Sequence, residues 1–246
     1  MRNITRLAAL LTMMLFALLA TGAPAAVAQD EATPPESGSK SNVFDDLGQL
    51  EGLHTVIARD FSVDYEAIYS SMATPEVDEE FIDPELPQGL QYMGAAIFHF
   101  ENDDNASNAY DLLTEDLTEQ SAANGIDYEE IEVEDFGDNT IALKAEEGDE
   151  TYGTTTLVVI ITQQDEYLYL GTGTALEDDP TDSVTELVSH VKDADAGDGD
   201  GEFHADGTSQ GGLWDKFPTV DDDLIPEGLI VTDSQLYPET TPESGS

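Results

Sequence analysis

The chain of 246 residues contains no cysteine, one tryptophan and only 7 lysine and arginine residues. Without cysteine there are no disulfides, thiolate metal ligands or cysteine nucleophiles. The shortage of basic residues argues against nucleic-acid and anionic-membrane binding, because both depend on Lys and Arg to neutralise phosphate. The fold must therefore be stabilised by a hydrophobic core, for which the chain is long enough.

Acidic residues are abundant, with 54 Asp and Glu and a net charge of −47. They are spread over every segment, which is typical of proteins that work in concentrated salt, where screening over a few Å removes self-repulsion. The alternative is an acidic face that binds a cationic partner or a divalent metal. We expect adaptation to high salt and keep the binding surface as the alternative.

The N-terminus has the pattern of a secretory signal peptide, residues 1–28. Arg2 and Arg6 precede an apolar run at 7–20, and Ala26-Val27-Ala28 has the small-x-small spacing of a cleavage site. The run is shorter than the roughly 20 residues that cross a bilayer. We expect cleavage after Ala28, secretion and no membrane insertion of the product.

Composition divides the remaining chain into four parts. Residues 29–42 are a polar, proline-bearing spacer that we expect to be disordered. Residues 43–192 carry the regular apolar patterns of a core domain. Residues 193–212 are a Gly/Asp-rich linker, and residues 213–246 form a C-terminal segment that we expect to be partly docked, with a disordered end.

The least charged stretch after the signal peptide, 154–175, predicts a β-hairpin. Its β-branched and leucine run at 157–161 is short enough for a strand and too short for a membrane span. Residues 163–166 resemble a chain reversal, and a second strand begins at 167–170. We expect this hairpin in the middle of a sheet.

Helical periodicity at 105–122 and 181–191 predicts two helices that cover the hairpin. Further strands are predicted at 55–61 and 90–100, and alternation around 130–134 predicts another. Adjacent strands with segregated helices indicate an α+β fold. We expect a single antiparallel sheet of about five to six strands with helices packed on it.

The order of these elements resembles a known type of exported domain. The strand 95–100, an acidic break, a helix, Phe136-Gly137-Asp138 and an apolar hairpin with a closing helix follow one another. This order is similar to the extracellular sensor-like domains of certain actinobacterial kinases and related secreted proteins. The resemblance covers about residues 90–192 and implies a non-catalytic binding or sensing module, with no functional residue to carry over.

One segment has the composition of a metal site. It places carboxylates at nearly alternate positions between glycines, at Asp193, Asp195, Asp198, Asp200 and Glu202. Calcium takes six to eight oxygen ligands, and such a segment can fold around it. The segment departs from the EF-hand loop, which needs glycine at its sixth position. The competing interpretation is a solvated flexible linker that binds calcium weakly or not at all.

Motifs for catalysis are few. None of the four histidines forms an H-x-x-x-H pair, and no G-x-S-x-G elbow is present. Gly171-Thr172-Gly173 lacks the third glycine and the helix of a dinucleotide loop. We therefore expect a non-catalytic, exported, acidic domain that binds an unknown extracellular ligand or protein of cationic character. A calcium-binding protein is the first alternative and a carboxylate-based hydrolase the second.

Calcium binding at residues 193–202 predicts a rise in melting temperature at millimolar CaCl2, because a ligand of the folded state stabilises it. A variant lacking these residues should lose the rise, as measured by thermal melts. Stabilisation by molar NaCl alone, with no calcium effect, would instead support salt adaptation.

Overall fold

The computed structural model describes residues 47–64, 88–124, 126–133, 136, 139–149, 153–220 and 222–237. The predicted signal peptide, 1–28, and the spacer, 29–42, lie outside these residues, as does the C-terminal end from 238. Among the described helices, none has both the length and the apolarity that a bilayer crossing requires.

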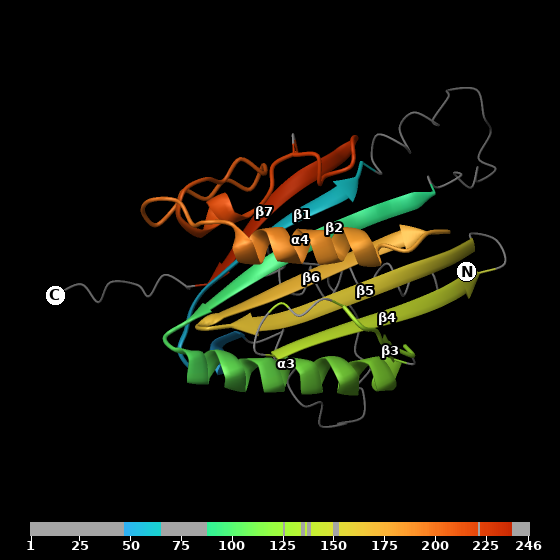
Figure 1. Ribbon diagram of the computed structural model, residues 1–246, viewed down its shortest axis with the longest axis horizontal. Helices are drawn as coiled ribbons and strands as arrows, with labels where there is room; N and C mark the ends of the chain where they lie inside the picture. The colour runs from blue at the N-terminus through green and yellow to red at the C-terminus, as the bar shows by residue number, and fades with distance from the viewer. Residues whose placement is uncertain are drawn as a thin grey trace, which may run out of the picture.

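One sheet of seven strands, in the order β3-β4-β5-β6-β2-β1-β7, forms the body of the protein (Figure 1). The strands are β1 (Leu53–Val63), β2 (Gly89–Phe100), β3 (Glu129–Glu130), β4 (Asn139–Asp149), β5 (Gly153–Gln164), β6 (Tyr167–Leu176) and β7 (Leu229–Tyr237). Every neighbouring pair is antiparallel. The predicted α+β class with one antiparallel sheet is confirmed. The predicted number of about five to six strands is too low, because the C-terminal segment contributes β7.

The predicted hairpin is confirmed as β5 and β6, the third and fourth strands of the sheet. Their register runs from Gln164 opposite Tyr167 to Thr155 opposite Leu176. Asp165, in the turn between them, has a φ of 52°, a left-handed conformation that aspartate tolerates better than most residues. The predicted strand around 130–134 is reduced to the two residues of β3.

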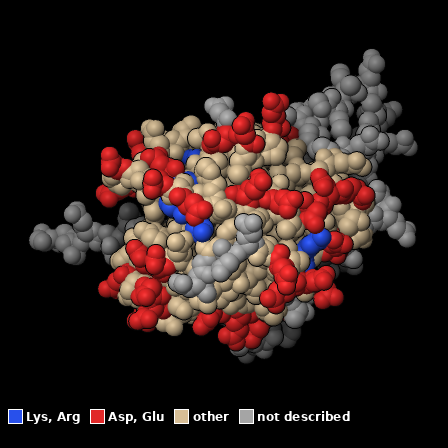
Figure 2. Space-filling view, in the orientation of Figure 1, with Lys and Arg blue, Asp and Glu red and all other residues tan. Residues whose placement is uncertain are grey.

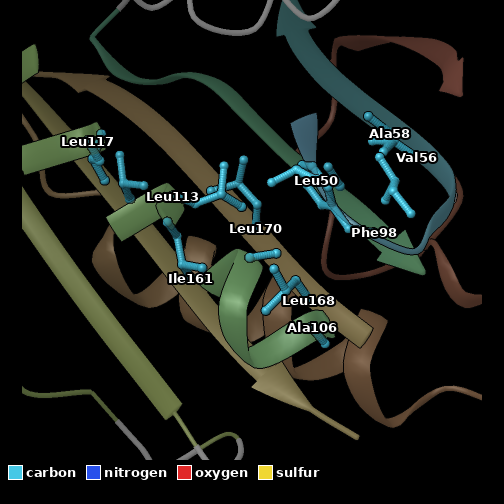
Figure 3. Packing of buried hydrophobic residues seen from close by; sticks show 14 of the residues in the cluster. Leu50, Val56, Ala58, Phe98, Ala106, Leu113, Leu117, Ile161, Leu168 and Leu170 are labelled. Atoms are coloured by element: carbon cyan, nitrogen blue, oxygen red, sulfur yellow. The ribbon is translucent and has the colours of Figure 1, made fainter. Parts of the chain in front are cut away.

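Helix α3 (Asp103–Asn124) covers one face of the sheet. Its inward side chains Ala106, Leu113 and Leu117 are no more than 2 % exposed. Figure 3 shows them with sheet residues that include Phe98, Ile161, Leu168 and Leu170. The short 3-10 helix η2 (Leu47–Gln49) precedes Leu50, which belongs to the same cluster. The helical periodicity of the sequence therefore identified this face correctly.

Helix α4 (Thr181–Asp193) covers the opposite face, which is turned to the viewer in Figure 1. Its four buried side chains are Val184, Leu187, Val188 and Val191. A methyl group at Gly171 would overlap Val188, and one at Gly173 would overlap Val184. The two glycines of β6 thus let α4 lie directly on the strand.

After α4 the chain runs through the 3-10 helix η3 (Gly212–Lys216) to the edge strand β7. Arg59 on β1 holds this part of the molecule. Its guanidinium makes a bidentate ion pair with Asp233 on β7: Nε donates to Oδ1 at 2.7 Å and Nη2 donates to Oδ2 at 2.8 Å. It also donates to the carbonyl oxygens of Ser209, at 2.9 Å, and Pro218, at 3.2 Å. Because Arg59 is 3 % exposed, the pair depends on these additional hydrogen bonds to offset the loss of hydration.

Breaking this pair should destabilise the protein strongly. We expect Arg59→Met or Asp233→Asn to cost about 3–5 kcal/mol, because each leaves a buried charge without its partner. The control is Lys144→Met, which removes pairs with Glu146 and Asp179 at the surface and should cost no more than about 1 kcal/mol. Chemical unfolding measures both. Equal losses for Arg59→Met and Lys144→Met would contradict the role assigned to Arg59.

Candidate functional site

The five carboxylates of the predicted calcium segment are all exposed. Asp193 is the last residue of α4 and pairs with Lys192 at 3.0 Å. Glu202 forms a β-bridge with Gln210 and lies 3.3 Å from the ring of His204. Within the part of the chain that the structure describes, no three His, Asp or Glu side chains are grouped as a metal site. The calcium prediction therefore rests on the sequence pattern alone.

The segment is not a free linker along its whole length. Gly197 donates its backbone N–H to Gly212 O at 2.8 Å, and Glu202 exchanges backbone hydrogen bonds with Gln210. The carboxylate of Asp215 receives a hydrogen bond from Gly211 N at 2.6 Å. These bonds tie the residues after α4 to the stretch around η3, so the segment is fixed against the α4 face at several points.

Four rings from three neighbouring strands form a continuous row at the end of the sheet. We call His54, His99, Tyr167 and Tyr169 the ring row. The centroids of His54 and His99 are 5.5 Å apart. His99 stacks on Tyr167 at 4.7 Å with an interplanar angle of 11°, and Tyr167 lies 6.1 Å from Tyr169. The row runs from an exposed end, His54, to a buried end, Tyr169, which is 5 % exposed.

Strand register explains why these rings meet. His99 on β2 is opposite Tyr167 on β6, and cross-strand neighbours stand side by side on one face. An irregularity in the β1–β2 register between Leu53 and Thr55 allows His54 to join them. The predicted hairpin already placed Tyr167 and Tyr169 on one face, since they are two residues apart. The pairing of His54 with His99 gave no local signal in the sequence.

Carboxylates surround the ring row, and burial keeps its central histidine neutral. Desolvation and the neighbouring His54 lower the pKa of His99, and the charge of Glu166 acts in the opposite direction. Burial, followed by Glu166, raises the pKa of Tyr167. Burial also raises the pKa of Tyr169, and the charges of Asp165, Glu166 and Asp193 contribute to this shift. At neutral pH His99, Tyr167 and Tyr169 are therefore uncharged rings close to negatively charged side chains.

A lysine of the protein already occupies the buried end of the row. The ammonium group of Lys216 lies 5.9 Å from the centroid of Tyr169. It donates to the carbonyl oxygens of Lys192, at 3.1 Å, and Ala194, at the C-terminal end of α4. Burial lowers the pKa of Lys216, and the charges of Asp193 and Asp195 oppose that shift. The row thus binds a cation within the fold by the contacts expected for an ammonium group over an aromatic ring.

Another titratable group with a perturbed pKa, Asp60, lies on the other face of the sheet. Burial raises the pKa of Asp60 to about 7; a hydrogen bond from Tyr92 opposes the shift and the charge of Asp233 adds to it. Tyr92 donates to the Asp60 carboxylate at 2.7 Å. Perturbed acids of this kind are found at functional sites more often than elsewhere.

Each Lys and Arg among the described residues has a partner in the same chain. Arg59 pairs with Asp233, and Lys144 pairs with Glu146 and Asp179. Lys192 pairs with Asp193 and lies 5.8 Å from the Phe136 ring centroid. Figure 2 shows the consequence on the α4 face, where carboxylates are widespread and basic groups occupy a few small spots. The exposed carboxylates that have no basic partner face the solvent, where they attract dissolved cations.

Comparison with known proteins gave no match to a family model, a curated protein or a solved structure. The resemblance to exported sensor-like domains therefore stays a prediction, and the geometry of the ring row is the basis for a functional proposal.

The environment of His99 predicts a titration midpoint below 6.5, measured from its ring resonances by NMR. His54→Gln should raise the midpoint and Glu166→Gln should lower it further. As the pH falls, the His99 ring takes up a proton at a higher pH in the unfolded chain than in the fold. The fold therefore loses stability as the pH falls from 6.5 through the lowered pKa of His99. A midpoint at or above 6.5, or no response to either substitution, would contradict the described environment.

Proposed function

We propose that the protein is an exported, non-catalytic binding domain, adapted to high salt, whose ring row binds a cationic segment of an extracellular partner. The single observation that carries this proposal is the row itself. Its four rings lie side by side across three strands, His54, His99 and Tyr167 are at least partly exposed, and nearby carboxylates act on the row by their charge. The signal-peptide pattern at residues 1–28 supports export.

The charge of the surroundings favours a cation over an anion. The charges of Asp165, Glu166 and Asp193 act on Tyr169. The lowered pKa of His99 keeps that ring from becoming a competing positive charge at neutral pH. Lys216 at the buried end is an internal example of the same interaction. A partner that places a cation over the exposed rings would make the same kind of cation–ring contact at the outer end of the row.

Arginine is the side chain that fits this surface best. Its guanidinium group is planar and stacks on aromatic rings, and it donates two parallel hydrogen bonds to a carboxylate such as Glu166. In concentrated salt the general attraction between an acidic surface and a cation is screened over a few Å. Contacts at the ring row are short-range, so they would still distinguish partners when the long-range field is lost.

Substitution of one ring tests the proposal. A hexa-arginine peptide is titrated into the protein in about 2 M NaCl, where long-range attraction is screened, and binding is followed by isothermal calorimetry. We expect Tyr167→Leu to weaken binding about five-fold, because an exposed cation–ring contact contributes up to about 1 kcal/mol. The substitution leaves the net charge unchanged.

The matched control is Tyr110→Leu, which removes a partly buried tyrosine from α3 on the other face. It should bind the peptide as the wild type does. Equal binding by Tyr167→Leu and the wild type, or equal losses in both variants, would refute a specific role of the ring row. A hexa-lysine peptide should bind more weakly than hexa-arginine, since ammonium groups neither stack on aromatic rings nor form bidentate hydrogen bonds with a carboxylate.

A further inference from the structure

On the α3 face, three side chains with oxygen donors surround Gly94. Gly94 on β2 is opposite Asp60 on β1 and opposite Thr172 on β6. Tyr92 lies two residues before Gly94 and therefore on the same face of the strand. The cluster Asp60, Tyr92 and Thr172, which we call the Gly94 site, lies one step along the strands from the apolar residues Ala58, Ala96 and Leu170 of the α3 face.

The glycine is what leaves room for this cluster. A Cβ atom at position 94 would overlap the Tyr92 hydroxyl oxygen and the Asp60 carboxylate. The phenol and the carboxylate therefore meet over the bare backbone of β2, where Tyr92 donates to Asp60 at 2.7 Å. Glycine within a strand is common where a ligand or another group approaches the backbone closely.

The third oxygen has no partner of ordinary geometry. Thr172 is 9 % exposed, and its hydroxyl is a buried polar atom without a hydrogen bond in the structure. Thr172 lowers the pKa of Tyr92 through the hydrogen bond that its hydroxyl would donate to the ionised phenol. Buried hydroxyls are nearly always hydrogen-bonded, because an unpaired one loses its hydration without compensation. The unpaired hydroxyl of Thr172 and the buried carboxylate of Asp60 flank Gly94 from the two strands that neighbour β2. Together they point to a missing ligand that both oxygens share.

We propose that the Gly94 site binds a monovalent metal cation, sodium or potassium, through the oxygen atoms of Asp60, Tyr92 and Thr172. All three donors are oxygens, which hard cations prefer. The site holds a single carboxylate, so one monovalent charge neutralises it. Calcium needs six to eight oxygen ligands and usually several carboxylates. A bound cation would compensate the charge of Asp60, which is 8 % exposed, and would accept the free lone pair of Thr172.

The test uses Thr172→Val, which replaces the unpaired hydroxyl by a methyl group of similar size. Melting temperatures are measured at pH 8 in NaCl, KCl and choline chloride at equal concentration, since choline is too large for the site. For the wild type we expect a higher melting temperature in one or both alkali salts, by about 2–4 °C. The alkali salt with the larger effect identifies the preferred ion.

In Thr172→Val the difference between alkali and choline salts should shrink, whereas in choline chloride the variant should melt at or above the wild type. The matched control is Thr162→Val, which removes a buried hydroxyl that is paired with Thr140 at 2.8 Å. It should lower the melting temperature equally in all three salts. An unchanged difference between salts in Thr172→Val would overturn the proposal.

Asp60→Asn gives an independent result if the threonine variant does not fold. It removes the charge that the cation neutralises, so the difference between alkali and choline salts should again shrink. Sodium-23 relaxation of the folded protein provides a direct readout: the wild type should broaden the sodium resonance more than Asp60→Asn does, and added KCl should reverse the broadening if potassium competes. Equal broadening by the two proteins, together with equal salt differences, would overturn the proposal.

Discussion

The buried ion pair between Arg59 and Asp233 is the contact on which the arrangement of the C-terminal part depends. It joins β1 to β7 and, through the carbonyl oxygens of Ser209 and Pro218, fixes the intervening chain on the α4 face. A charge pair removed from water is tolerated when further hydrogen bonds support it. Here Arg59 donates four hydrogen bonds, and Asp233 also accepts one from the backbone N–H of Ser209. The same chain carries Lys216 to the end of α4 and to the ring of Tyr169, so the pair also supports the inner end of the ring row.

The described Lys and Arg side chains all have partners in the same chain. The net charge of the whole chain is −47, so a large excess of carboxylates remains. Such a surface is stable where dissolved cations screen it over short distances. We propose that two places in the structure bind cations beyond this general screening. The ring row combines carboxylates with neutral rings and would select an organic cation, whereas the Gly94 site offers three oxygens and would select a small inorganic one.

The elements with regular periodicity could be predicted from the sequence, and those defined by distant partners could not. Both helices and the hairpin of β5 and β6 follow from local apolar patterns. Strand β7 carries Asp233 at an inward-facing position. A charged residue there makes the sequence resemble a loop unless its partner Arg59 is known. For the ring row, the sequence indicates only that Tyr167 and Tyr169 share one face of a strand. The meeting of His54 and His99 depends on the irregular register of β1 and β2.

The most direct test of the proposed function is a map of the binding surface. Amide resonances of the folded protein are followed by NMR in about 2 M NaCl, where long-range attraction is screened, while hexa-arginine is added. The account predicts that the largest shifts fall on His54, His99 and the turn at Asp165 and Glu166, with little change along α3. Shifts spread evenly over the acidic surface, or concentrated on α3, would contradict it.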